Sequence, residues 1–229
     1  MPQRPKPHET NLHAKGLARG QYGRLCCWWC ANDPLYELYH DSEWGVPTVS
    51  DQRLFEKICL EGFQSGLSWL TILRKREGFR DAFRKFDFRQ VAEFTPSDVD
   101  RLVGNAAIVR HRAKISSTVN NARRACEMVQ EYGSLAAYFW QWEPPSESRP
   151  AVIDQQTLRS LNWTAESAAL AKDLKKRGWS FVGPTTAYAF MQAMGLVNDH
   201  VEGCWRRPRV AALRSTLAVP SAGCPKGRR

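Results

Sequence analysis

The sequence predicts an all-α globular domain whose N-terminal part is rich in loops and aromatic residues. Apolar residues recur at helical spacing over residues 51–194, and helix-start residues and glycines bracket these segments. No two alternating strand segments joined by a turn signal stand out. The chain has 229 residues, 43% of them hydrophobic, which suits one domain of ordinary size with a real core.

The first strongly predicted helix begins at Ser50 or Asp51, because either side chain can cap a helix. Its apolar positions recur at helical spacing over residues 54–59. Glycines at 62 and 66 interrupt this pattern, and an apolar run resumes over residues 67–73. Another amphipathic segment follows over residues 79–86.

The middle of the chain predicts two helices joined by a tight turn. Thr95, Pro96 and Asp98 form a strong helix start, and Gly104 ends that helix. A long periodic helix is expected over residues 108–132.

Shorter helices follow this pair. They are expected over residues 134–143, from Thr164 to Gly178, and after Pro184.

A helix pair of this kind can present backbone N–H groups to a phosphate at the start of its second helix. Positive charge lies close by in the sequence, at Arg110, His111, Arg112 and Lys114. The arrangement suits sequence-independent binding to a DNA backbone. The alternative is an ordinary helical hairpin whose basic side chains face solvent.

The charge of the chain favours a polyanionic partner. Lys plus Arg number 33 and Asp plus Glu 23, which gives a formal net charge of +10. Nucleic acid is the commonest partner of a protein with such a surplus. The alternative is that net charge serves only solubility.

The two ends differ from the rest of the chain. Residues 1–23 hold three prolines, several basic residues and almost no large apolar ones, so we expect a disordered basic arm. Residues 207–229 form a basic tail that contains proline and glycine, and this tail is also expected to be disordered. The predicted domain therefore spans residues 24–206.

The sequence contains no apolar run of about 18 residues, so we expect no membrane-spanning segment. The basic N-terminus lacks the apolar region of a secretory signal, which predicts a cytoplasmic protein in a reducing compartment. In such a compartment the seven cysteines are expected to be metal ligands or buried thiols rather than disulfides.

A candidate metal site combines residues from both ends of the domain. His200 and Cys204 share one helix face or turn, and Cys27 precedes His40 by a C-x12-H spacing. Two cysteines and two histidines make a closed tetrahedral zinc site, which is structural because no position is left for water. Within the same stretch two further thiols compete with Cys27 for this role: Cys26 and Cys30. The C-x-x-C spacing of Cys27 and Cys30 also allows a thiol oxidoreductase, although no strand is expected before it.

A carboxylate lies at the end of an apolar helix, just before a glycine-broken turn. Glu61 is either a solvent-exposed residue of the last turn or a buried recognition group. Aromatic rings that could stack on a base or a cationic ring lie near it in the sequence: Tyr36, Tyr39, Trp44 and Trp69. Core packing is the alternative role for each of them.

Five stretches, in order, resemble the bacterial 3-methyladenine DNA glycosylase I family. They are DPLYELYHDSEWGVP (33–47), LFEKICLEGFQSGLSW (54–69), IVRHRAKI (108–115), LKKRGWSFVG (174–183) and FMQAMGLVNDHVEGC (190–204). The match covers roughly residues 25–206. The resemblance implies a helix-hairpin-helix DNA glycosylase fold with a structural zinc that joins the N- and C-terminal parts.

The resemblance also implies roles for individual residues. The zinc ligands would be Cys27, His40, His200 and Cys204. The base pocket would contain Tyr39, Trp44, Trp69 and Glu61. Our own hypothesis is that Glu61, as the catalytic residue, both recognises the base and assists its release electrostatically. The residues that contact DNA would be Gln64, Ser65, Gly66 and Leu67 in one turn, with Leu67 as the wedge, and Gly104, Arg110, Arg112 and Lys114 in the hairpin.

The implied activity is hydrolytic excision of flipped-out 3-methyladenine from double-stranded DNA, without strand cleavage, because no lysine can be argued for as a nucleophile. The protein is expected to act as a monomer at the bacterial nucleoid. The alternative is a zinc-containing DNA-binding module without catalysis. One residue departs from the family: Trp28 stands where the family usually has glycine between the cysteine and the tryptophan of its first motif.

Overall fold

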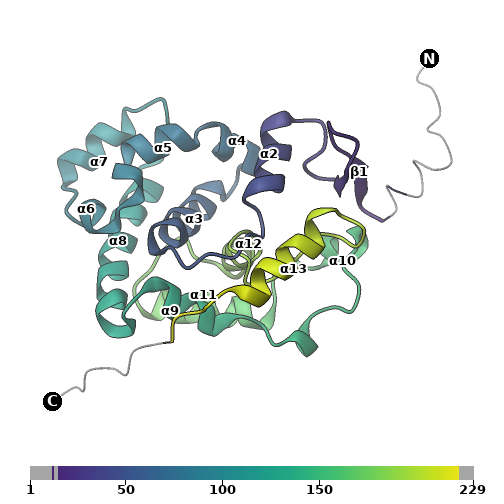
Figure 1. The fold of residues 1–229 in the computed structure, drawn as a ribbon. Helices are drawn as coiled ribbons and strands as arrows, with labels where there is room; N and C mark the ends of the chain where they lie inside the picture. Colours follow the sequence, from purple (N-terminus) through teal and green to yellow (C-terminus); the bar gives the residue numbers. More distant parts are fainter. Residues whose placement is uncertain (1–11, 13–14, 222–229) are drawn as a thin grey trace.

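Helix α3 (Asp51–Gln64) runs through the middle of the molecule and is buried along most of its length (Figure 1). The structure is a computed structural model that describes residue 12 and residues 15–221. Helix α3 packs against α4 (Trp69–Arg74), α8 (Arg112–Tyr132), α9 (Leu135–Phe139) and α12 (Pro184–Ala193). The fold is thus mostly helical, as predicted.

The remaining helices are α2 (Pro34–Ser42), α5 (Arg76–Ala82), α6 (Phe88–Ala92), α7 (Pro96–Val103), α10 (Gln155–Ser160), α11 (Ala165–Lys176) and α13 (Arg206–Thr216). Three short 3-10 turns complete the helical part at Arg84–Phe86, Trp140–Trp142 and Ser146–Ser148. In Figure 1, α5, α6, α7 and α8 gather at one end of the molecule, while β1, α2 and α10 lie toward the other.

The predicted helix caps are present. Ser50 accepts from the backbone of Arg53 at the start of α3. Thr95 and Asp98 form a reciprocal capping box at the start of α7, which ends at Gly104. Thr164 caps α11 in the same reciprocal way. These side chains satisfy backbone N–H groups that the first helical turn leaves unpaired.

The connection between α7 and α8 is longer than predicted. Helix α8 begins at Arg112 rather than at residue 108, because His111 is its N-cap and accepts from the backbone N–H of Lys114 (3.4 Å). The connection over residues 104–111 therefore contains a turn at Gly104 and a second turn that the amide of Ile108 closes on the carbonyl of Asn105 (3.4 Å). The loop lies directly on α5, where a side chain at Gly78 would come within 2.6 Å of the carbonyl oxygen of Ala107.

Two short strands lie where the sequence predicts none. Strand β1 (Leu17–Arg19) pairs antiparallel with β2 (Leu25–Cys27), so Leu17 is opposite Cys27. Each strand has three residues, which is too short to show an alternating pattern in the sequence. The strict all-α expectation is therefore wrong at this point.

Regular structure is present in both ends that the sequence predicts to be disordered. Strand β1 lies within residues 1–23, and all of α13 except Arg206 lies within the tail at 207–229. Both are held by the domain: Leu17 and Val210 are buried, and the backbone N–H of Trp205 donates to the carbonyl of Leu25 (2.9 Å). Within these two ends, residues 1–11, 13–14 and 222–229 lie outside the described residues.

An aromatic core fixes the end of the molecule that carries the α7–α8 loop. Phe63 from α3 packs against Phe79 at 4.5 Å between ring centroids, and Phe83 stacks on Phe86 at 5.6 Å. All four side chains are fully buried. This packing ties the C-terminal end of α3 to α5.

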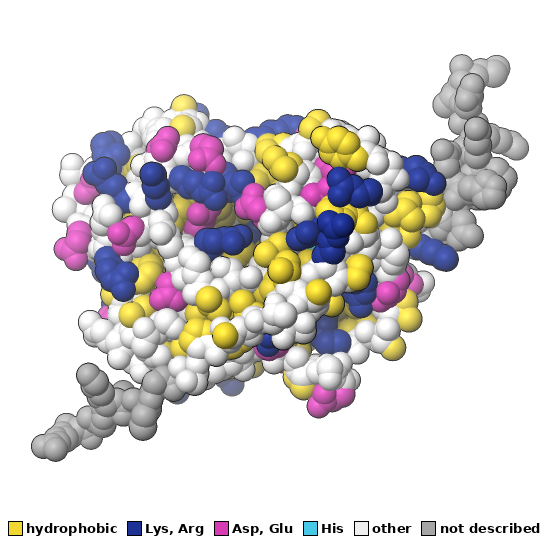
Figure 2. All heavy atoms as spheres, viewed as in Figure 1, with side chains coloured by type: hydrophobic (Ala, Val, Ile, Leu, Met, Phe, Trp, Pro, Cys, Tyr) yellow, Lys and Arg dark blue, Asp and Glu magenta, His cyan; other side chains and the backbone are white. Residues whose placement is uncertain are grey.

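On the face drawn in Figure 2, Lys and Arg side chains are scattered among Asp and Glu side chains rather than gathered into one patch. Across the described part of the chain, none of the helices has the length and apolar character needed to cross a bilayer.

Candidate metal centre and aromatic pocket

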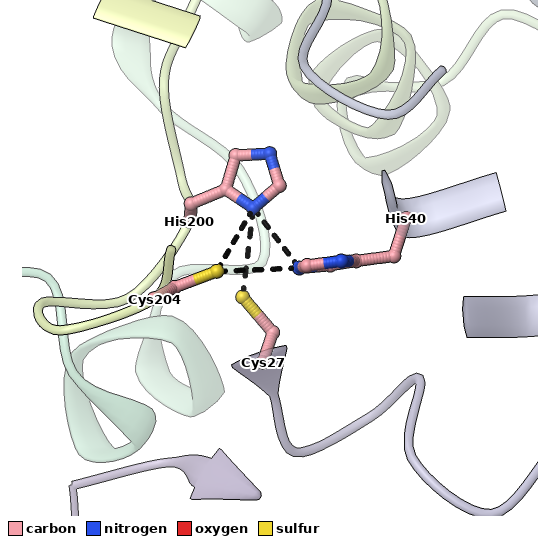
Figure 3. A group of neighbouring side chains, drawn as sticks. All are labelled: Cys27, His40, His200 and Cys204. Carbon is pink, nitrogen blue, oxygen red and sulfur yellow. Dashed lines mark hydrogen bonds between the residues drawn. The ribbon is translucent and has the colours of Figure 1, made fainter. Parts of the chain in front are cut away.

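Four side chains converge at one point between the N- and C-terminal parts of the domain (Figure 3). Cys27 comes from the end of β2, His40 from α2, and His200 and Cys204 from the segment between α12 and α13. Their donor atoms all lie within 4.8 Å of one another, and all four residues are buried. This is the set that the sequence indicates.

The distances between donor atoms fit a tetrahedral metal ion. Nδ1 of His200 lies 3.1 Å from Nε2 of His40, 3.6 Å from Sγ of Cys204 and 3.7 Å from Sγ of Cys27. Tetrahedral zinc with ordinary bond lengths would place such atoms roughly 3.3–3.8 Å apart. The four donor atoms are therefore close enough together to bind one metal ion.

Contacts behind the histidines orient both rings. Nδ1 of His40 lies 2.7 Å from a carboxylate oxygen of Asp41, and Nε2 of His200 lies 3.1 Å from the carbonyl oxygen of Trp44. Each ring thus has an acceptor at one nitrogen and turns the other nitrogen toward the two thiols. Metal-binding histidines in proteins are usually held in this way.

The two thiols of the centre differ in acidity. Burial raises the pKa of Cys27. Hydrogen bonds from Cys27 and from the two histidines hold the pKa of Cys204 far below the usual thiol range. A thiolate at Cys204 is the form that a metal ion requires.

The neighbouring thiols are directed elsewhere. Cys30 donates to the carbonyl of Cys27 (3.0 Å), and Cys26 donates to the carbonyl of Ala18 (3.5 Å). Cys27 is thus the thiol of this stretch that joins the four-residue cluster. The sequence predicts no strand before the C-x-x-C pair, which is wrong because β2 ends at Cys27. No helix begins there, however, whereas the C-x-x-C pair of a thiol oxidoreductase opens a helix.

A cavity of about 210 Å³ lies beside the metal centre. All four residues that the sequence suggests for a base pocket line it, together with Gln64 from the following turn. Its lining residues are Trp28, Trp29, Tyr36, Tyr39, Trp44, Glu61, Gln64, Trp69, Leu158, Ala189 and Gln192.

The metal centre supports one wall of this pocket. The ring of Trp44 lies 4.7 Å from the ring of His200, and the ring of Trp29 lies 5.3 Å from that of His40. Trp29 and Trp44 also pack edge to face at 4.8 Å. A shift in the position of either histidine would therefore also move the aromatic rings of this wall.

Glu61 is buried in the last turn of α3, with 6% of its surface exposed, and it has a partner that the sequence analysis missed. The ammonium of Lys57 lies 2.7 Å from its carboxylate and 2.8 Å from the hydroxyl of Tyr39, to which it donates. The same ammonium lies 3.1 Å from the ring centre of Trp69. Lys57 stands four positions before Glu61, a spacing that could have pointed to the pair.

Burial changes the acidity of the groups around the pocket. It lowers the pKa of Lys57 to about 8, against the opposing effect of Glu61. Burial, together with the charge of Glu61, raises the pKa of Tyr36 to about 12 and raises that of Tyr39 well above the usual range. Both phenols therefore stay protonated at neutral pH.

The turn after α3 is the exposed rim of the pocket. Gly66 has φ +79°, a conformation that suits glycine, and a side chain there would meet no atom within 4 Å. Leu67 is 41% exposed at the tip, although it is a large apolar residue. Gln64 reaches into the pocket, while Ser65 is exposed on the same turn.

The basic residues near the start of α8 do not form one surface. Arg110 is exposed, and Arg112 is exposed but pairs with Asp100 (2.6 Å). Lys114 differs from the expectation: it is 8% exposed, and its ammonium donates to the carbonyls of Phe63 and Ser65. These bonds assign Lys114 to the turn after α3 rather than to an exposed DNA-binding surface.

Comparison with known proteins gives a consistent result. The sequence model of the methyladenine glycosylase family matches residues 29–207. The chain is 49% identical to DNA-3-methyladenine glycosylase 1 of Escherichia coli over 179 residues, which cover 78% of this chain and 94% of that protein.

Solved structures agree with the sequence comparison. A crystal structure of 3-methyladenine DNA glycosylase I superposes with a TM-score of 0.73 and 46% identity, over 80% of this chain and all of the other. A structure of such an enzyme in complex with 3-methyladenine gives a TM-score of 0.69 with 34% identity, over 79% of this chain and 96% of the other. On this evidence, the chain belongs to the methyladenine glycosylase family.

Proposed function

We propose that this protein is a DNA repair glycosylase that hydrolytically excises 3-methyladenine from double-stranded DNA. The observation that carries this proposal is the buried carboxylate of Glu61 in a pocket walled by aromatic rings. The names of the relatives support it, since they are DNA-3-methyladenine glycosylases.

The chemistry asks little of the protein. N3-methylated adenine in DNA carries a positive charge, so it is already a good leaving group. Water attacks C1′ of the deoxyribose, the bond from C1′ to the base breaks, and its electron pair neutralises the base. One proton of the water goes to solvent. The protein has to expose the base, orient it and hold it.

Glu61 recognises the base in this scheme. Its carboxylate accepts from the exocyclic amine, and its charge favours a cationic ring over unmodified adenine. Tyr39, Trp44 and Trp69 supply faces and edges on which the ring can stack. The ion pair with Lys57 offsets part of the charge of Glu61, which leaves more of the selection to hydrogen bonding.

A base in duplex DNA has to leave the stack before it can enter this pocket. The turn of residues 64–67 enters the duplex at that position, with Leu67 as the wedge and Gly66 allowing close approach of the backbone. Helices α7 and α8 act as a helix-hairpin-helix element on the DNA backbone, through the loop at Gly104 and the side chains of Arg110 and Arg112.

The four-residue centre holds a structural zinc ion. Its two thiols and two imidazoles are the donors that zinc prefers, and four protein ligands leave no position for a reacting water. Cys27 and Cys204 tie the two ends of the domain together beside the pocket wall. The protein acts as a monomer on bacterial chromosomal DNA, at the nucleoid.

The position of Lys57 supports hydrolysis without strand cleavage. This lysine does not line the pocket and is engaged by Glu61, Tyr39 and the ring of Trp69. An amine held in this way does not attack the sugar, so no covalent Schiff base forms with the DNA.

The test is the release of free base from a methylated duplex, followed by chromatography, with 7-methylguanine measured in the same sample. We expect 3-methyladenine to appear and the phosphodiester backbone to stay intact. Protein that has a filled metal site and binds DNA but releases no base would favour a DNA-binding module instead.

A further inference from the structure

Lys57 lies behind the pocket wall, on the side of Tyr39 and Trp69 that faces away from the cavity described above. It lines a separate, small space of about 30 Å³ that shares Tyr39 and Trp69 with the pocket. Only 5% of its surface is exposed. A lysine is rarely buried to this extent unless its charge has a function or a close partner.

The contacts of the ammonium are specific. It donates to the hydroxyl of Tyr39 (2.8 Å), pairs with a carboxylate oxygen of Glu61 (2.7 Å), and lies against the ring of Trp69. Those three residues are among the four to which the proposed function gives the recognition and stacking of the base; Trp44 is the fourth. One buried cation thus contacts all three from behind.

The other charged groups around Lys57 that are partly buried are already paired with one another. Arg76 makes two hydrogen bonds to Glu43 (2.7 and 2.8 Å), and Arg80 pairs with Glu56 (2.8 Å). Arg53, the remaining charged residue of this lining, is exposed to solvent. Glu61 is therefore the carboxylate that is left to balance Lys57, and Lys57 is the cation that is left to balance Glu61.

We infer that Lys57 is a positioning residue, whose ammonium holds the Glu61 carboxylate and the Tyr39 ring in place at the pocket wall and offsets the carboxylate charge. This inference rests on the proposed function. The inference also concerns specificity. Because Lys57 offsets the charge of Glu61, the pocket selects a base by the fit of the amine of the base and not only by the positive charge of the base.

The acidity of Lys57 makes this role measurable as a pH dependence of base release. Burial lowers the pKa of Lys57 to about 8, so the ammonium loses its proton as the pH rises through about 8. Tyr39, the other titratable group in direct contact besides Glu61, stays protonated there because its pKa is raised. The release of 3-methyladenine should therefore fall as the pH rises through about 8.

The experiment compares single-turnover release of 3-methyladenine and 7-methylguanine by the full-length metal-loaded protein and three variants, from about pH 6.5 to about pH 9.5. The variants are Lys57→Met, Lys57→Arg and, as a matched control on the exposed face of α11, Lys172→Met. Metal content and thermal unfolding of each variant show that it is folded.

We expect Lys57→Met to lower the release of 3-methyladenine at neutral pH by about tenfold. It should abolish the decline above pH 8 and reduce the ratio of 3-methyladenine to 7-methylguanine released. Lys57→Arg keeps its charge, so it should restore most of the activity and show no decline up to about pH 9.5. Lys172→Met should match the unmodified protein.

An alkaline decline that persists unchanged in folded Lys57→Met, or full activity and an unchanged base ratio in that variant, would overturn the inference. Failure of the proposed function has a different signature, because the unmodified protein itself would then release no base at any pH.

Discussion

The ammonium of Lys114 donates to the carbonyl oxygen of Ser65 at 2.5 Å, across 49 positions of sequence. A second bond joins it to the carbonyl of Phe63 (2.8 Å). These carbonyls lie at the C-terminal end of α3, where a helix leaves acceptors unpaired and favours a positive charge. The first turn of α8 therefore holds the turn of residues 64–67 in place.

Lys114→Met should disorder that turn without removing a contact to DNA. We expect base release from duplex DNA to fall by about tenfold, because a misplaced wedge exposes the base less often. The salt dependence of DNA binding should stay unchanged, since Lys114 is buried. The measurements are base release and DNA binding at several salt concentrations, with Lys172→Met as the control. A weaker salt dependence in Lys114→Met would show that Lys114 contacts the DNA backbone.

Arg110 should behave in the opposite way. It is exposed, and in the described part of the chain no acidic side chain pairs with it, whereas Arg112 pairs with Asp100. Arg110→Gln should weaken binding to any duplex and reduce the slope of log K against log salt by about 0.9. The same change at Arg112 should reduce the slope less, because that residue gives up an ion pair when it binds a phosphate. Equal slopes in both variants would contradict this reading.

The sequence predicts the helix caps and the clustering of the four candidate metal ligands, because each depends on residue type at a fixed spacing. Thr95 and Asp98 are such a case, as are His200 and Cys204. Lys57 was not predicted, because a lysine four positions before a glutamate is usually a solvent-exposed pair, and only tertiary packing buries it. Strand β1 was not predicted either. Only one of its three residues is buried, so the sequence shows no alternating pattern there.

The proposed structural zinc makes a prediction that separates Cys27 from its neighbours. We expect the unmodified protein to bind one metal ion per chain and Cys27→Ser to lose it. The free energy of unfolding should fall by a few kcal/mol, because the site closes a loop across nearly the whole domain. Cys26→Ser and Cys30→Ser should retain the metal, since their thiols donate to backbone carbonyls. Metal analysis and thermal unfolding measure these effects. Loss of metal in Cys30→Ser but not in Cys27→Ser would show that Cys30, and not Cys27, is the ligand.

Glu61→Gln tests recognition apart from DNA binding. The release of 3-methyladenine should fall by at least about a hundredfold, whereas binding to undamaged duplex should be unchanged. This substitution leaves the ammonium of Lys57 without its carboxylate, which costs about 3–5 kcal/mol for a buried pair. The double variant Lys57→Met with Glu61→Gln removes both charges and should recover much of this stability but none of the activity. Equal losses of release and of duplex binding would argue against the role of Glu61.

The buried ammonium of Lys57 also predicts how stability depends on pH. Its pKa is lowered to about 8 in the folded protein, while an exposed lysine has a pKa of 10.5. Between these two values the unfolded chain binds more protons than the folded one, so stability should rise with pH.

The clean measurement is the difference in free energy of unfolding between the unmodified protein and the double variant with Lys57→Met and Glu61→Gln, in which neither group titrates. Groups elsewhere titrate alike in both proteins, so their contributions cancel. The difference should shift in favour of the unmodified protein, by at most about 3 kcal/mol, as the pH rises from about 7 to about 10.5. Because a lysine that is solvated in the folded state binds protons as it does in the unfolded chain, a difference that stays constant with pH would show that the ammonium is not buried.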